Sequence, residues 1–294
     1  MGGPLVSRRD SRFKEASLGR PRWRDGLTDD ERDKQHAHLI AAFVEFDRIC
    51  RAYNIPYYLV AGSLLGAVRH QGIIPWDDDV DIGLLRPDYE RFVQVASDEL
   101  GGRYFLQTTE SDPDYFFCYA KIRVNGTKFV EASCIDCDIH HGVYIDIFPL
   151  DNVPRSPAIR WAHAGLCRVL NMMVLARGHY RELSPMKNRM VRALRVLLRP
   201  IPFRTLTRWR QAAIQLSRND ESASVVMFGA PWSYQRGCAP RRCFSKSIEL
   251  TFEGHSARAP AMWDEYLTHV YGDYMTPPPE DERGKAHSIV ELQL

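Results

Sequence analysis

Apolar residues recur at helical spacing in the first part of the chain, which predicts a long N-terminal helix. Thr28 stands three residues before Glu31, the spacing of a capping box, so the helix should start there. Asn54-Ile55-Pro56 should stop it, and we expect the helix to run to about Ala52. The apolar stripe consists of Leu39, Ile40, Phe43, Val44, Phe46 and Ile49.

The following apolar runs are short and separated by turn residues, which predicts strands alternating with helices. Residues 57–60 read as a buried strand, 64–70 as a two-turn helix and 79–84 as a second strand. Arg86-Pro87 should open another helix, because proline is favoured in the first turn. Further strands are expected at 104–108, 116–124, 128–132 and 143–148. The predicted fold class is therefore α/β (α+β), a mixed sheet flanked by helices.

The distribution of charge along the chain sets one segment apart from the rest, although the overall composition is ordinary. The apolar share of 45% is ordinary for a globular protein, and the net charge is only +2. Residues 156–218, however, contain thirteen Lys or Arg and a single acid, Glu182, which gives this segment about +12. Its apolar residues fall at helical spacing, so we expect a basic helical subdomain with breaks at Ser184-Pro185 and at 200–202. Its basic face is either simply solvated or binds an anionic membrane or a polyanionic acceptor.

The ends of the chain complete the predicted organisation. Residues 1–27 are rich in Arg, Gly, Pro and Ser and should form a disordered or loosely docked tail. Residues 28–155 should form the core, and residues 219–294, with a helix near 263–271, should complete the same domain.

Nothing in the sequence predicts a signal peptide or a transmembrane helix, because no apolar run has the required length. Seven scattered cysteines predict reduced thiols, as in a cytoplasmic protein. Cys134 and Cys137 form one CxxC, but no second CxxC supplies the other two ligands of a zinc site.

Four carboxylates stand where the strand at 79–84 begins: Asp77, Asp78, Asp79 and Asp81. Side chains at positions i and i+2 of a strand point the same way, so Asp79 and Asp81 should share one face. Carboxylates this close repel each other unless a cation lies between them. All-oxygen ligands favour Mg²⁺ or Mn²⁺ over zinc. The alternative, a solvated acidic turn, fits poorly with the apolar residues on both sides of the cluster.

Asp146 is the candidate third ligand, because it interrupts the apolar strand predicted at 143–148. A charge in such a strand is costly unless it is paired. The alternative is a structural aspartate held by an arginine or by backbone amides.

Gly62 and Ser63 lie where the strand at 57–60 gives way to a helix. A glycine lets a phosphate approach the backbone, and the helix N-terminus presents free N–H groups to it. Arg69 and His70 end the same helix and are candidates to bind a diphosphate or a departing nucleotide. For both residues a solvated helix terminus is the alternative. Together with the carboxylates, this turn indicates metal-dependent phosphoryl transfer.

The stretch 62–83, GSLLGAVRHQGIIPWDDDVDIG, resembles the signature of the LicD family. The resemblance continues through 120–123, 141–151 and 271–275, and is weak at 156–218. It implies a nucleotidyltransferase-like core in which Asp79, Asp81 and Asp146 bind the metal and Gly62 and Ser63 form the Gly-Ser turn. It also implies a CDP-activated alcohol donor, such as CDP-choline, and a sugar hydroxyl on a glycan or lipid-linked glycan as acceptor.

The expected reaction moves phosphocholine or a polyol phosphate onto a cell-surface glycan, such as lipopolysaccharide or teichoic acid, and releases CMP. The metal ligands Asp79, Asp81 and Asp146 are the expected catalytic residues, with Asp146 or a neighbour of Asp79 as base. Arg69 and Lys121 are candidate phosphate clamps. The expected location is the cytoplasm, with the basic segment in contact with the inner face of the plasma membrane. No nucleic-acid partner is expected.

Three other functions remain open from the sequence. A nucleotidylyltransferase would release pyrophosphate, and a glycosyltransferase would use the Asp-x-Asp pair with a nucleotide sugar. A catalytically dead scaffold would use the basic segment to bind polyanions. The transferred alcohol is also open, since an aromatic cage would favour choline. Candidate cage residues are Tyr57, Trp76, Tyr115, Trp232 and Tyr234.

Overall fold

The computed structural model describes residues 27–181, 185–217, 222–230, 232–279, 283 and 288–294. The expected N-terminal tail therefore lies, but for residue 27, outside the described residues. The helices are α1 (Asp29–Ala52), α2 (Ala61–His70), α3 (Arg86–Glu99), α4 (Pro157–Arg177), α5 (Pro185–Leu197), α6 (Phe203–Ile214), α7 (Tyr234–Gly237) and α8 (Trp263–Tyr271). Short 3₁₀ turns occupy Ala132–Cys134 and Arg241–Phe244.

A mixed sheet forms the core, which confirms the predicted fold class. Five strands follow the order β1-β2-β6-β4-β3, and β7 and β8 extend the sheet from the end of β6. Strands β2 and β6 run parallel, whereas the other described pairs are antiparallel. The sheet strands are β1 (Tyr58–Leu59), β2 (Asp81–Leu85), β3 (Tyr104–Gln107), β4 (Ala120–Val124), β6 (Tyr144–Asn152), β7 (Ser224–Val226) and β8 (Cys238–Pro240). Two separate pairs are β5 (Lys128–Glu131) with β11 (Ile289–Gln293), and β9 (Ser247–Phe252) with β10 (His255–Pro260).

Helix α1 confirms the predicted N-terminal helix and its capping box. The backbone N–H of Glu31 donates to the Thr28 hydroxyl at 3.3 Å, and the Glu31 carboxylate accepts from the Thr28 backbone N–H at 3.1 Å. Phe43 and Phe46 are buried on the apolar stripe and contact rings from other segments. Burying one such side chain stabilises the fold by about 1.5–3 kcal/mol.

Several expected boundaries were wrong, among them the beginnings of α2, β2 and β4, and β6 continues to Asn152 beyond the expected residue 148. Helix α2 begins at Ala61 rather than at residue 64, because Ala61 already makes the turn with φ +48°. Strand β2 begins at Asp81, so Asp79 lies in the loop before it. Strand β4 begins at Ala120 rather than at residue 116. The carbonyls of Phe116 and Phe117 accept hydrogen bonds from Arg210 on α6 and not from a neighbouring strand.

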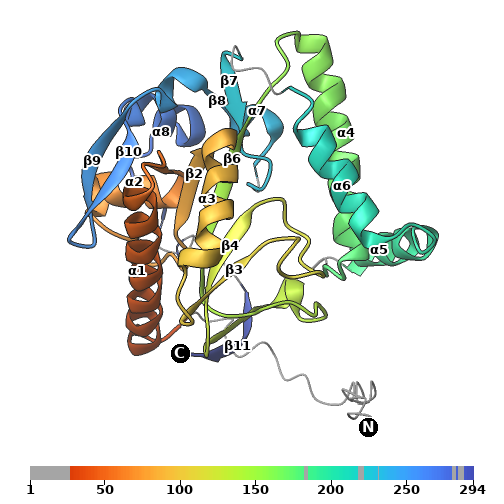
Figure 1. Cartoon of the computed structure of the whole chain (residues 1–294), viewed down its shortest axis with the longest axis horizontal. Coiled ribbons are helices and arrows are strands. Elements are labelled where there is room, and N and C mark those ends of the chain that lie inside the picture. The colour runs from red at the N-terminus through yellow and green to blue at the C-terminus, as the bar shows by residue number, and fades with distance from the viewer. Residues whose placement is uncertain (1–26, 182–184, 218–221, 231, 280–282, 284–287) are drawn as a thin grey trace.

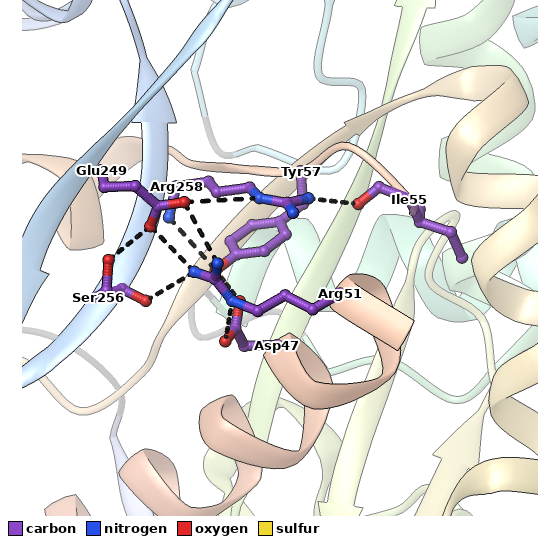
Figure 2. Close-up of polar contacts among 7 residues, drawn as sticks. All are labelled: Asp47, Arg51, Ile55, Tyr57, Glu249, Ser256 and Arg258. Carbon is purple, nitrogen blue, oxygen red and sulfur yellow. Dashed lines mark hydrogen bonds and ion pairs between the residues drawn. The ribbon is translucent and has the colours of Figure 1, made fainter. Parts of the chain in front are cut away.

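The β9–β10 hairpin is fastened to the end of α1 by a polar network (Figure 2). Arg51 donates to Asp47 within α1 and to Glu249 on the hairpin, at 2.7 Å and 2.9 Å. The Tyr57 hydroxyl also donates to Asp47, at 2.6 Å. The Arg258 guanidinium lies over the Tyr57 ring and donates a hydrogen bond to the Ile55 carbonyl. Residues some 200 positions apart in the sequence thus hold one corner of the fold together.

Helices α4, α5 and α6 lie together on one side of the molecule, away from α1 and the β9–β10 hairpin (Figure 1). This confirms the helical character of the basic segment and a break before Phe203, where α6 begins. Residues 182–184, including the expected break at Ser184, lie outside the described residues. Ten of the fifteen large apolar side chains that are exposed in the described residues belong to these three helices. None of the described helices combines the length and the apolar character needed to cross a bilayer.

Candidate active site

Strands β2 and β6 bring the predicted carboxylates together. Asp81 lies directly opposite Asp146 in the parallel register, so the two side chains emerge on the same face of the sheet. Asp79, in the loop just before β2, joins them. Ligand oxygens of Asp79, Asp81 and Asp146 all lie within 4.8 Å of one another.

Asp146 is buried and paired with Lys121. The Lys121 ammonium lies 2.6 Å from Asp146 Oδ1, across the antiparallel register of β4 and β6. The ammonium also lies 3.3 Å from the ring centroid of Tyr144. Burial raises the pKa of Asp146, although Lys121 and Arg123 act in the opposite direction. The expected phosphate clamp Lys121 is therefore placed as the partner of a candidate metal ligand.

The acidic loop before β2 is held by α1. The Gln35 side-chain amide donates to the Asp78 carbonyl at 2.7 Å, and a ring nitrogen of His36 bonds the Asp77 carbonyl at 3.0 Å. Carboxylate oxygens of Asp77, Asp78 and Asp79 also lie within 4.8 Å of one another. Two groups of carboxylates thus share Asp79.

The first turn of α2 contacts Asp81 of the first carboxylate cluster and Asp77 of the second. The Asp81 backbone N–H donates to the Ser63 hydroxyl at 2.7 Å, which fixes the start of β2 against α2. A Cβ atom on Gly62 would lie 2.7 Å from Asp77 Oδ2, so any other residue at this position would displace that carboxylate. The positive φ of Ala61 sets the direction of this turn, and such backbone strain is often found at functional sites. Gly62 and Ser63 therefore lie at the carboxylates, as expected for a catalytic turn.

Arg69 and His70 lie at the other end of α2, about 10 Å along the helix axis from Ser63. Both face Trp76, which immediately precedes the acidic loop. The Arg69 guanidinium is 6.0 Å from the Trp76 ring, and the His70 ring meets it edge-on at 5.9 Å. The guanidinium of Arg283 lies 4.8 Å from the same indole. Burial, and then the neighbouring Arg283, lowers the pKa of Arg69.

The structure does not gather the candidate cage residues into one cage. Tyr57 and Tyr115 are fully buried in separate ring clusters. Trp76 already faces two arginines, and the Trp232 ring faces the Arg236 guanidinium at 5.4 Å. The five residues therefore do not form one common cage, although Trp232 and Tyr234 line the same cavity.

The CxxC does not take part in a metal cluster. All seven cysteines are free thiols, and Cys134 and Cys137 are buried beside the C-terminal end of α4. The Cys137 thiol donates to the Gly178 carbonyl at 3.3 Å. Neither thiol belongs to a group of described residues with metal-binding spacing.

A structural ion pair lies at the far end of the same two strands. Arg86 donates two hydrogen bonds of 2.7 Å to Asp151, and both side chains are largely buried. From the sequence, Arg86 was expected only to open a helix and Asp151 only to belong to the block 141–151 that resembles the LicD family, with no indication that they meet. Pairs of opposite charge in separate apolar runs are the signal that could have suggested it.

Comparison with known proteins agrees with this geometry. Residues 54–157 match the family described as LicD/FKTN/FKRP, nucleotidyltransferase domain. The chain is similar to the lipopolysaccharide cholinephosphotransferase LicD of Haemophilus influenzae, with 30% identity over 85% of this chain and 92% of that protein. It is also similar to human ribitol 5-phosphate transferase FKRP, with 39% identity over 72 residues, 23% of this chain and 14% of that protein. The matched region 54–157 contains Gly62, Ser63, Lys121 and the three carboxylates.

Proposed function

The chain belongs to the LicD family, and on that premise we propose that it moves a phospho-alcohol from a CDP-activated donor to a hydroxyl group of a cell-surface glycan, releasing CMP. Its similarity to these relatives shows that it is a transferase of phosphate-containing groups. The observation that carries the finer proposal is the convergence of Asp79, Asp81 and Asp146. Phosphocholine is the first candidate group and ribitol phosphate the second, because relatives carry these two activities in their names.

The three carboxylates suit Mg²⁺ or Mn²⁺. Their donors are hard oxygens, and the three carboxylates lie close enough together to bind one divalent cation. We propose that Asp79, Asp81 and Asp146 hold the ion. Its chemical contribution is to neutralise phosphate oxygens and stabilise the departing CMP.

The chain's own groups position the reactants. Lys121 holds the orientation of Asp146, and Ser63 holds the start of β2 through the Asp81 backbone. Asp146 is the proposed acceptor of the hydroxyl proton, because burial raises its pKa towards the range of a useful base. We propose that Arg69 binds the donor diphosphate, because its guanidinium lies near the ring of Trp76, the residue that precedes the acidic loop.

Helix α5 supports the proposed contact with an anionic membrane, at the inner face of the plasma membrane. Met186, Met190 and Leu197 lie on one face of the helix and are 73%, 66% and 75% exposed. Lys187 and Arg189 are exposed in the same helix. Apolar side chains with basic neighbours are typical of helices that lie in the membrane interface, and their charge complements anionic lipid.

The experiment that tests the proposal is incubation with CDP-choline, CDP-ribitol and CDP-glycerol, each with Mg²⁺ and a lipopolysaccharide or teichoic acid acceptor. We expect CMP together with labelled acceptor from one of the three donors. Pyrophosphate as product would indicate a nucleotidylyltransferase, and a nucleoside diphosphate released from a nucleotide sugar would indicate a glycosyltransferase. No product with any donor, together with no effect of Mg²⁺ on stability, would indicate a scaffold.

A further inference from the structure

A large cavity lies between α4 and the segment that carries β7, α7 and β8. Its volume is about 990 Å³, at the upper end of the range for small-molecule sites. Arginines and aromatic rings line it, and none of the described residues that line it is an aspartate or a glutamate. The residues that matter here are Arg160, Trp161, Arg168, Arg210, Trp232 and Tyr234.

Arg210 gives the cavity a buried positive charge without a matching carboxylate. The side chain is 1% exposed, and its guanidinium donates only to the carbonyls of Phe116 and Phe117 and to Asn171 Oδ1 among the described residues. Its Nε is buried and has no hydrogen-bond partner there. A buried cation without a counter-charge is costly, so an anion bound nearby would stabilise it.

The segment that lines the cavity packs against aromatic rings next to β6 and α8. Gly229 packs directly on the ring of Tyr119, and that ring contacts Phe148 on β6. Trp232 meets the ring of Tyr271 edge-on at 5.9 Å. The cavity therefore lies beside β6, the strand that carries Asp146.

The lining defines the chemistry of the ligand. Aromatic faces stack on the C–H faces of sugar rings, and guanidinium groups bind phosphate or carboxylate. The proposed donor contact, Arg69 on α2, and its neighbour Trp76 in the loop before β2 do not line this cavity. We infer that the cavity binds the acceptor, and that the acceptor is an oligosaccharide bearing phosphate or carboxylate groups. This inference rests on the proposed function, because it needs a second substrate that is a glycan.

The test uses binding alone, so that its outcome does not depend on turnover. The full-length protein is titrated calorimetrically with a glucosamine disaccharide 1-phosphate, the same disaccharide without phosphate, digalacturonate, and CMP. We expect at least tenfold tighter binding of an anionic disaccharide than of the neutral one, and the phosphate and carboxylate arms identify which anion is preferred. Equal affinity for neutral and anionic disaccharides would overturn the inference.

Two variants locate the binding site. Arg168 is exposed, and Trp161 is 69% exposed, so Arg168→Gln and Trp161→Ala should fold normally. Each should weaken binding of the anionic disaccharide about tenfold, as expected for loss of a charge-assisted hydrogen bond or a stacking surface. The matched controls Arg204→Gln and Trp209→Ala change exposed residues of α6 outside the cavity lining and should bind like the wild type.

The two proposals fail in different ways. Normal disaccharide binding without CMP release in any donor assay would remove the proposed function but leave the cavity as a saccharide site. Weakened binding of CMP, rather than of the disaccharide, in Arg168→Gln and Trp161→Ala would assign the cavity to the nucleotide and overturn the inference. Equal effects of the α6 controls would also overturn it.

Discussion

Asp81 lies directly opposite Asp146 across the parallel pair β2–β6. This register places two carboxylates side by side on one face of the sheet, and Asp79 adds a third from the preceding loop. Lys121 contributes one positive charge to this group. Carboxylates at this spacing repel one another, and a bound cation would offset that repulsion, so we expect Mg²⁺ to stabilise the fold through the same register that builds the candidate site.

We predict that Asp81→Asn abolishes transfer without unfolding the protein. The substitution removes a proposed metal ligand but also one of three repelling carboxylates, so the melting temperature without metal should stay equal or rise. Activity should fall about 100-fold or more. The measurements are CMP release and thermal unfolding with and without Mg²⁺. Asp98→Asn, at an exposed position of α3, is the control and should retain both activity and the Mg²⁺-induced rise in melting temperature. Normal turnover by Asp81→Asn would refute the metal assignment.

A second prediction concerns the buried ion pair. Lys121→Met leaves the Asp146 carboxylate buried without its ammonium partner, which should cost about 3–5 kcal/mol of unfolding free energy. Because a divalent cation would replace the lost charge, the stabilisation by Mg²⁺ should be larger in this variant than in the wild type. Urea denaturation at several Mg²⁺ concentrations measures both. Equal Mg²⁺ dependence in the two proteins would show that Asp146 is not a ligand.

The sequence was sufficient to predict features that rest on local spacing. The capping box of Thr28 and Glu31, and the basic helices after residue 156, follow from periodicity and charge within a few turns of chain. Asp146 could be singled out because a charge in an apolar strand must have a partner. The resemblance to the LicD family also rests on contiguous blocks of sequence, and the comparison with known proteins confirmed it. The fold class was confirmed as well.

Features that depend on distant pairing could not be predicted. Lys121 was expected to bind phosphate, because the sequence does not show that the register of β4 and β6 places it against Asp146. Residues 116–119 have strand-like sequence. However, Arg210, more than ninety residues later, donates hydrogen bonds to the carbonyls of Phe116 and Phe117, which a neighbouring strand would otherwise bind. In each case a tertiary contact outweighed the local preference.

We predict that Ser63→Ala lowers both stability and activity. The Ser63 hydroxyl is buried and accepts the hydrogen bond of the Asp81 backbone N–H, so its loss leaves a buried donor unsatisfied. The expected cost is about 1–3 kcal/mol. Denaturant unfolding measures the cost, and Ser97→Ala on the exposed face of α3 is the control. If Ser63→Ala lost stability but kept full kcat, Ser63 would be a structural residue and not a positioning one.

The imidazole of His140 should titrate below its ordinary range. Its Nδ1 accepts from the Gly142 backbone N–H at 3.0 Å, so Nε2 carries the proton that is donated to Asn125 Oδ1. Burial, and then Arg123, lowers the pKa of His140. The folded state therefore binds protons less well than the unfolded state. The contribution of His140 to stability is full above pH of about 6.5 and is lost as the pH falls through the lowered pKa.

NMR titration of the imidazole resonances measures this pKa directly. In addition, His140→Asn should flatten the dependence of the melting temperature on pH between about 5 and 7. His255→Gln changes an exposed histidine in β10 and should leave that dependence unchanged. A His140 pKa at or above the ordinary value would contradict the prediction.

Binding to anionic vesicles tests the exposed face of α5. We predict that the protein sediments with phosphatidylglycerol-containing vesicles and not with pure phosphatidylcholine, because each Lys or Arg near an anionic surface contributes about 1 kcal/mol. Binding should weaken steeply between 50 and 300 mM salt, conditions over which the Debye length falls from about 14 Å to about 6 Å.

The apolar contribution is tested by Met190→Gln combined with Leu197→Gln. Both side chains are largely exposed, so the fold should tolerate the change, while vesicle binding should fall at least tenfold as the buried apolar area is lost. Met275→Gln, which changes an exposed apolar residue outside the basic helices, should bind like the wild type. Salt-independent binding, or equal loss in the Met275→Gln control, would leave the basic helices as a solvated face.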